Sequence, residues 1–160
     1  MSTTLPNPTP GETSLPTLLA SMQPTLDNQT YIFLTIPPSH PSHPSSSSSN
    51  LSTLFTTLQP LMIYTEPEGL TVITTPSLAS AAGYTDFVFE CRKITLQIHS
   101  SLEAVGLMAK VSGALAKAGV SANVVSGFYH DHFFVPVGRE GVAIGVLEGV
   151  VREARGEVVG

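Results

Sequence analysis

The sequence has one cysteine and no long apolar run, and each shortage excludes a class of protein. Cys91 is the only cysteine among 160 residues, so no internal disulfide can form and nothing requires an oxidising compartment. No apolar run approaches the roughly 20 residues that a membrane-spanning helix needs. The beginning of the chain lacks the basic start and apolar run of a secretion signal, and it lacks the arginines of a mitochondrial presequence. We therefore expect a soluble, cytoplasmic protein.

Positive charge is missing from the first half of the chain. No lysine or arginine precedes Arg92, whereas six of the 12 acidic residues do, and the whole chain carries a net charge of -5. Binding to nucleic acid depends on lysine and arginine side chains that neutralise phosphates, and attraction to an anionic membrane surface depends on the same side chains. The sequence therefore predicts no nucleic-acid partner and no membrane partner.

Known enzyme motifs are also missing. The sequence has no G-x-S-x-G nucleophile elbow, no G-x-x-x-x-G-K phosphate loop and no dinucleotide-binding glycine pattern. Cys91 as a nucleophile with His99 as its base is conceivable, but Cys91 lies within an apolar alternation, and a buried thiol on a strand is usually inert. We expect no catalytic residue and no cofactor, and hence a protein that is not an enzyme.

The two halves of the chain show the same order of elements: strand, loop, helix, hairpin of two strands, helix, strand. Such βαββαβ units form a four-stranded antiparallel sheet with helices on one face, the ferredoxin-like arrangement. The sequence thus predicts an α+β fold of two ferredoxin-like modules. The spacing of apolar residues and turn residues predicts strands at 31–36, 61–64, 70–74, 87–91, 94–99, 120–125, 128–137 and 157–159, and helices at 51–58, 77–82, 100–118 and 141–152.

Composition divides the chain further. Residues 1–16 contain four prolines, with threonine and serine between them, and we expect a flexible Pro/Thr leader that gains order only by lying on a neighbour and has no function. Residues 37–50 form a low-complexity insert of prolines, histidines and serines, which predicts a surface loop. The expected modules are residues 17–91, which carry this insert, and residues 92–160.

The best candidate for a ligand site is the loop from His99 to Gly106, where a strand ends and a helix is expected to begin. Ser100 and Glu103 have the S-x-x-E spacing of a capping box, which predicts that the helix starts at Ser100. Free N–H groups and the positive end of the helix dipole would receive a carboxylate there, while Asp131 could pair with an ammonium group. A plain structural explanation is also open, in which these residues only cap the helix and let it pack closely.

The run HSSLEAVGLMAKVSGALAKAGVSANVVSGFYHDHFFVPV, from His99 to Val137, resembles the C-terminal module of small proteins that carry ACT domains, the amino-acid-sensing regulatory fold, in their two-module, CASTOR-like form. The similarity covers residues 90–150 and is weaker before Tyr84, so the first module would be a degenerate ACT module. The resemblance implies a small-molecule amino-acid effector bound at a module interface. Because the sequence shows no catalytic domain for a sensor to regulate, we expect a homodimer or a regulated partner protein.

In ACT domains the loop after the first strand and the strand facing it carry the effector. Carried over by position, the resemblance implies that the following residues bind the ligand: His99, Ser100, Ser101, Leu102, Val105, Gly106, Asn123, Val124, Val125 and Ser126. Asp131 and His132 join this set, Asp131 as the partner of the ammonium group and His132 as a contact of the loop or the ligand. The Pro/Ser insert occupies the corresponding loop of the first module, so we expect no equivalent site there.

A metal site is the main alternative. His130 and His132 fall on the same side of an extended strand, and with His99 or Asp131 they could offer three ligands to zinc, as in a metal-binding protein or a metal-dependent hydrolase. The segment has no cysteine pair and no helical histidine spacing, which favours a structural or ligand-contacting role. The two histidines of the insert are expected to be solvated. A ligand-free dimerisation module is the third possibility.

Overall fold

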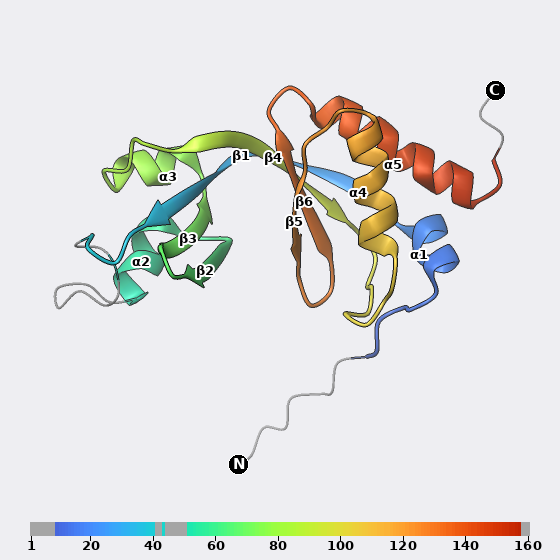
Figure 1. The fold of residues 1–160 in the computed structure, drawn as a ribbon, viewed down its shortest axis with the longest axis horizontal. Coiled ribbons are helices and arrows are strands. Elements are labelled where there is room, and N and C mark those ends of the chain that lie inside the picture. The colour runs from blue at the N-terminus through green and yellow to red at the C-terminus, as the bar shows by residue number, and fades with distance from the viewer. Residues whose placement is uncertain (1–8, 41–42, 44–50, 158–160) are drawn as a thin grey trace, which may run out of the picture. The chain divides into compact units, whose positions relative to one another are not determined.

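The computed structural model describes residues 9–40, 43 and 51–157 of the chain (Figure 1). They form an α+β fold, and they divide into two compact units: a first unit of the residues up to Leu26 together with those from Ile94 onward, and a second unit, Asp27–Lys93. The elements in chain order are α1 (Leu15–Ser21), β1 (Pro24–Ile36), α2 (Leu51–Leu58), β2 (Met62–Glu66), β3 (Gly69–Thr74), α3 (Pro76–Ala81), β4 (Val88–Leu96), α4 (Leu107–Lys117), β5 (Asn123–Ser126), β6 (Asp131–Pro136) and α5 (Glu140–Ala154).

The strands are hydrogen-bonded in the order β2-β3-β1-β4-β6-β5. If the four strands of a βαββαβ module are numbered along the chain, the ferredoxin-like sheet has the order 4-1-3-2. The fourth strand thus lies beside the first. In the second unit β4 takes the fourth place beside β1, and in the first unit the start of β1 takes the fourth place beside β4. The predicted fold class is therefore confirmed, and β1 and β4 each pass from one unit into the other.

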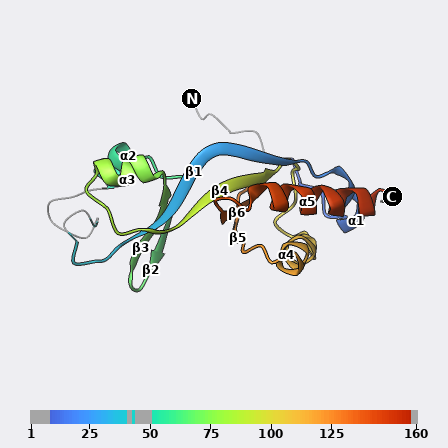
Figure 2. The same cartoon turned by 90° about the horizontal axis from the view of Figure 1, so that it is seen from above.

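In the second unit, α2 and α3 lie on one face of the strands, as Figure 2 shows. The side chains that fill the space between helices and strands alternate along β1 and β3, as expected where one face of a strand is buried. They are Ile32, Leu34, Ile36, Leu70 and Val72, packed with Leu54, Leu58 and Ala79 from the helices. The strands predicted at 31–36 and 70–74 and the helices predicted at 51–58 and 77–82 therefore supply this core.

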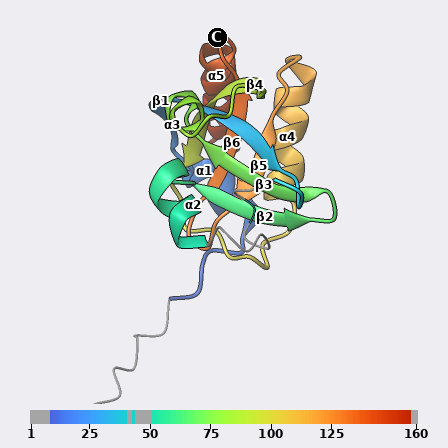
Figure 3. The ribbon, with the colours of Figure 1, turned by 90° about the vertical axis from the view of Figure 1, so that its left-hand side faces the viewer.

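The β2–β3 hairpin of the second unit turns between Glu66 and Gly69 (Figure 3). Gly69 has a φ of 149°, and a Cβ atom added there would lie 2.4 Å from the carbonyl oxygen of Ile36 on β1. Glycine is required at this position because no side chain fits between the hairpin and the neighbouring strand.

A polar cluster forms around Asp27 in the second unit. Its carboxylate accepts hydrogen bonds from the Tyr31 hydroxyl at 2.8 Å and the Gln29 backbone N–H at 2.9 Å, and it lies 3.0 Å from Lys93 Nζ. Burial alone would raise the pKa of the Asp27 carboxyl, but the hydrogen bonds and the lysine together lower it. Burial and the bond to Asp27 raise the pKa of Tyr31 to about 12.

The first unit has one apolar core, to which the beginning of the chain contributes. Buried Leu18, Leu19 and Met22 pack in the same cluster as residues of β4, α4, β6 and α5. The start of β1 continues the contact, because Thr25 Oγ1 donates to the Thr95 carbonyl at 3.3 Å and the Gln97 N–H donates to the Gln23 carbonyl at 2.8 Å. The described residues up to Leu26 are thus an integral part of this unit.

The element boundaries differ from the prediction at β4. The expected strands 87–91 and 94–99 form one continuous strand, Val88–Leu96, so the expected module boundary between Cys91 and Arg92 lies inside an element. Of the expected last strand, Glu157 is not in a strand, and the following residues lie outside the described part of the chain. The place of that strand is taken by the start of β1.

The predicted start of α4 at Ser100 is wrong. The helix begins at Leu107, and its N-cap is Gly106, with a φ of 96° and no side-chain cap. The Ser100 hydroxyl is instead bonded to Asp131, and the Glu103 N–H donates to Ser101 Oγ at 3.1 Å, which holds a turn within the loop. No helix of the described residues has the length and apolarity to cross a membrane.

Candidate functional site

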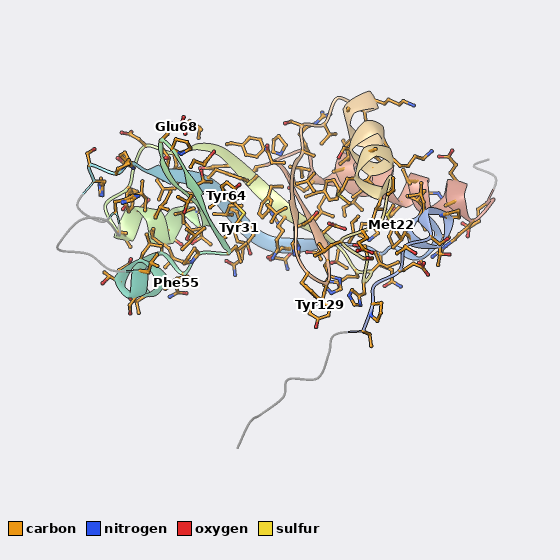
Figure 4. The ribbon with its side chains drawn as sticks, turned by 60° about the horizontal axis from the view of Figure 1, so that its bottom comes forward. Met22, Tyr31, Phe55, Tyr64, Glu68 and Tyr129 are labelled. Atoms are coloured by element: carbon orange, nitrogen blue, oxygen red, sulfur yellow. The ribbon has the colours of Figure 1, made fainter. Side chains whose placement is uncertain are left out.

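The site is built where the loop after β4 meets the β5–β6 hairpin of the first unit. The hairpin register places Ser126 opposite Asp131, and the intervening turn is closed by the Gly127 N–H, which donates to the His130 carbonyl at 2.9 Å. A Cβ atom on Gly127 would lie 2.9 Å from that carbonyl oxygen, so glycine keeps the turn tight. Figure 4 marks Tyr129 in this turn.

The centre of the site is the Asp131 carboxylate, which is only 5% exposed. Its Oδ2 accepts a hydrogen bond from Ser100 Oγ at 2.8 Å, and its Oδ1 accepts one from Ser126 Oγ at 2.6 Å. The three side chains therefore tie the loop to the hairpin.

A cavity of about 130 Å³ lies beside this carboxylate. Asp131 is the only charged residue of its lining, and four of the lining residues are apolar. The lining consists of Ser100, Ser101, Leu102, Ala104, Leu107, Met108, Ser126 and Asp131. A small molecule with an ammonium group and an apolar part would match this lining, because it offers a carboxylate and apolar side chains but no basic side chain.

A second cavity, of about 200 Å³, lies on the same loop. Its walls come from the loop, the hairpin turn and the beginning of the chain. They are Thr9, Pro10, Gly11, His99, Ser100, Ser101, Leu102 and Phe128. The His99 ring packs 4.9 Å from the Tyr129 ring and 6.4 Å from the Phe128 ring, measured between centroids, which fixes it on the hairpin turn.

The structure brings together half of the residues that the sequence singled out. Ser100, Ser101, Leu102, Ser126 and Asp131 line the first cavity, and His99 lines the second. Six lie near but line neither cavity: Val105, Gly106, Asn123, Val124, Val125 and His132.

The reasons for these placements differ. The Val105 side chain is 83% exposed, and a Cβ atom on Gly106 would meet the Leu15 side chain of α1 at 3.1 Å. His132 Nδ1 lies 2.9 Å from Thr95 Oγ1 on the neighbouring strand.

Sequence reasoning missed two groups of lining residues. Ala104, Leu107 and Met108 stand in or directly after the chosen loop, and the apolar stripe of the helix could have pointed to the last two. Phe128 and the leader residues Thr9 to Gly11 carry no pattern that would place them at this loop.

The alternative metal chemistry has little support in the geometry. The described residues include no group of three or more histidine, cysteine, aspartate or glutamate side chains placed to hold a metal ion. His130 Nδ1 is 3.1 Å from the Ile98 carbonyl, and the Asp131 oxygens accept bonds from two serines.

Burial raises the pKa of the Cys91 thiol to about 12, so at neutral pH Cys91 is not the thiolate that a nucleophile requires.

Comparison with known proteins agrees with this architecture. Two family models described as ACT domain match, one over residues 10–92 and one over residues 88–149. No curated protein matches the sequence.

Solved structures with a similar fold also match the chain. A Vibrio cholerae protein of unknown function, described as a possible transport protein, is 36% identical, with a TM-score of 0.70 over 86% of this chain and 95% of that one. The regulatory subunit of aspartate kinase from Thermus thermophilus is 12% identical, with a TM-score of 0.59 over 82% of this chain and 97% of that one.

Escherichia coli aspartokinase III, solved with aspartate and ADP, is 13% identical, with a TM-score of 0.58 over 80% of this chain and 33% of that one. At these low identities the two kinase structures share the fold alone. The matched models cover most of the chain between them, and the first covers more than half of it. The chain therefore belongs to the ACT-domain family, whose domains bind amino acids in regulatory proteins.

Proposed function

We propose that this chain is a regulatory sensor that binds a free amino acid beside Asp131 and acts, in the cytoplasm, through a partner protein, as CASTOR-like two-module members of the family would. The observation that carries the proposal is the buried Asp131 carboxylate, held by Ser100 and Ser126 at the wall of a cavity without a basic residue. The regulatory character of ACT domains supports it.

The lining of the cavity suggests how an amino acid would lie. The ammonium group would approach Asp131, because an ion pair shielded from water is stronger than one on the surface. An apolar side chain would lie against Leu107 and Met108. The lining offers no lysine or arginine to an acidic side chain, so we expect neutral amino acids to bind best.

Thermal unfolding of the purified chain against each common L-amino acid tests the proposal. A ligand at about a hundred times its dissociation constant stabilises the folded state by about 2.7 kcal/mol, which raises the midpoint by several degrees. Asp131→Asn should abolish that rise, because it removes the charge while keeping the shape. Asp86→Asn is the matched control, since Asp86 is exposed in the other unit and should leave the rise intact.

Three outcomes would contradict amino-acid binding. One is the absence of a shift with every amino acid. A second is an equal shift in the Asp131→Asn variant. A third is a shift produced by zinc alone and lost on mutation of His130 and His132, which would assign the segment to metal binding.

The exposed apolar side chains beside the cavities support a protein partner, and we propose a second copy of this chain. Val105 is 83% exposed and Leu102 is 68% exposed on the loop, while Phe128 and Tyr129 are 51% and 52% exposed on the hairpin turn. Apolar side chains grouped on one surface in this way mark interaction sites more often than scattered ones do. Effector binding beside such a surface would link the ligand to assembly.

Sedimentation of the Val105→Asp variant tests this proposal. We expect the wild-type chain to sediment as a dimer and the variant as a monomer, because a buried, unpaired carboxylate disfavours an interface. Val88→Asp is the matched control, since Val88 is 78% exposed in the second unit and should leave the dimer intact. A wild-type monomer, or loss of the dimer in the control alone, would argue against this surface.

A further inference from the structure

The leader segment Thr9–Glu12 is docked by its backbone on the loop from His99 to Gly106. The Glu12 N–H donates to the His99 carbonyl at 2.9 Å, and the Ser101 N–H donates to the Glu12 carbonyl at 2.9 Å. These two bonds form a parallel bridge between Glu12 and Ser100. The leader therefore adds a short extended segment to the stretch that carries the Ser100 hydroxyl.

The chain has two features that hold the leader in this position. A Cβ atom on Gly11 would lie 2.4 Å from the Ser101 backbone nitrogen, so only glycine permits the close approach. The Glu12 carboxylate accepts hydrogen bonds from the Thr13 and Ser14 N–H groups at 2.8 and 2.7 Å, where α1 begins. On the other side of this anchor, α1 is fixed in the core by Leu18 and Leu19.

The docked segment also forms a wall. Thr9, Pro10 and Gly11 close the second cavity against His99 and Phe128. Both cavities are lined by Ser100, Ser101 and Leu102. The stretch to which the leader is hydrogen-bonded therefore also lines the cavity beside Asp131.

We propose that the leader segment Thr9–Glu12 is part of the amino-acid site: it positions Ser100 and Ser101 for the ligand, and ligand binding in turn stabilises the docked leader. This inference rests on the proposed function. Gly11 is its positioning residue, because it does not line the cavity beside Asp131 and acts through the backbone of the loop. Binding and docking favour each other by the same factor, as linkage requires.

Cleavage by a glutamate-specific protease measures docking directly. The bond after Glu12 is held by the bridge and the turn, so it should be cut slowly in the wild-type chain. The amino acid that gives the largest thermal shift should slow this cleavage several-fold further. Cleavage after Glu157, which is exposed in the same unit, should not change and serves as the internal control.

Gly11→Ala should undock the leader, and calorimetric titration with the same amino acid should then show affinity about tenfold weaker, the equivalent of losing two backbone hydrogen bonds. Gly141→Ala in α5 is the matched control, since its Cβ atom would meet nothing within 4 Å. Pro10→Ala changes the wall of the second cavity only and leaves the bridge intact. Because the leader acts through the bridge, this variant should keep both wild-type affinity and slow cleavage after Glu12.

The outcomes separate this inference from the function on which it rests. Faster cleavage in Gly11→Ala with unchanged or tighter binding would overturn it, as would wild-type cleavage that the bound amino acid does not slow. Binding by the wild-type chain to no amino acid at all would overturn both, even with the leader protected. Weaker binding in Gly11→Ala, with ligand-slowed cleavage in the wild type, would support it.

Discussion

Asp27 and Tyr31 show how single residues respond to their surroundings. The Tyr31 hydroxyl and the Lys93 ammonium group both favour the charged form of the Asp27 carboxylate, and the same carboxylate disfavours ionisation of the tyrosine. The two groups therefore shift in opposite directions, one pKa lowered and the other raised to about 12. Their effects on stability appear at opposite ends of the pH range.

The pH dependence of unfolding follows from these directions. A carboxyl whose pKa is lower in the folded state stabilises the fold above its unfolded pKa of about 3.9 and loses this contribution as pH falls through the folded value. We therefore expect Asp27→Asn to be less stable than wild type near neutral pH, with the difference closing below about pH 4.

Urea unfolding across pH measures this difference, with exposed Asp86→Asn as the control. The raised pKa of Tyr31 adds a contribution that is present below about pH 10 and is lost as pH rises towards 12. Tyrosinate absorbance should show this tyrosine titrating at lower pH in the Asp27→Asn variant. A constant difference from acid to neutral pH would contradict the assignment.

Much of the candidate site was within reach of the sequence at the level of residue types. Hydroxyls at Ser100 and Ser126 and a carboxylate at Asp131 were chosen for their chemistry and for the family resemblance. Their direct bonds were not predicted, because the hairpin register that brings Ser126 opposite Asp131 depends on a tight turn at Gly127. The docked leader was out of reach, since backbone hydrogen bonds leave no pattern in side chains.

Glycines illustrate how the same residue has opposite effects in different elements. Gly69 begins β3 at a φ of 149° and has no room for a Cβ atom, whereas Gly145 lies in α5 with nothing within 4 Å. We expect Gly69→Ala to lower the free energy of unfolding by more than about 1 kcal/mol and Gly145→Ala to raise it by about 0.5–1 kcal/mol. Chemical denaturation of the pair checks both signs; equal effects would contradict the structure.

The prediction was right about the type of most elements and less accurate at their ends, and Glu157, expected in a last strand, is not in one. Apolar periodicity locates the helices and strands because buried faces repeat every two or every 3.6 residues. At α4 the S-x-x-E spacing misled, because Ser100 donates its hydroxyl to Asp131 rather than to the helix N-terminus. At β4 the sequence pattern predicts two strands, because the polar Arg92 and Lys93 interrupt the apolar alternation. The structure has one strand that continues through both residues.

At the scale of the whole molecule, the first unit is assembled from both ends of the chain. We expect a fragment of residues 92–160 to be largely unfolded, because Leu18, Leu19 and Met22 of its core and the start of β1 are missing. A peptide of residues 9–26 added in trans should restore helical circular dichroism and a cooperative thermal transition. A fragment that folds unaided would show that the boundary predicted from the sequence delimits an independent domain.

This assembly determines the order in which the two units can fold during translation. Residues 27–93 are contiguous and hold their own core, so the second unit can begin to fold while the rest is still being translated. The first unit cannot close until α5 has left the exit tunnel, because Leu147 and Val151 belong to the same core as Leu18. Leu18, Leu19 and Met22 therefore stay without their packing partners until α5 has been synthesised. A translational pause before α5, or a chaperone that binds these apolar residues, would affect this unit far more than the other.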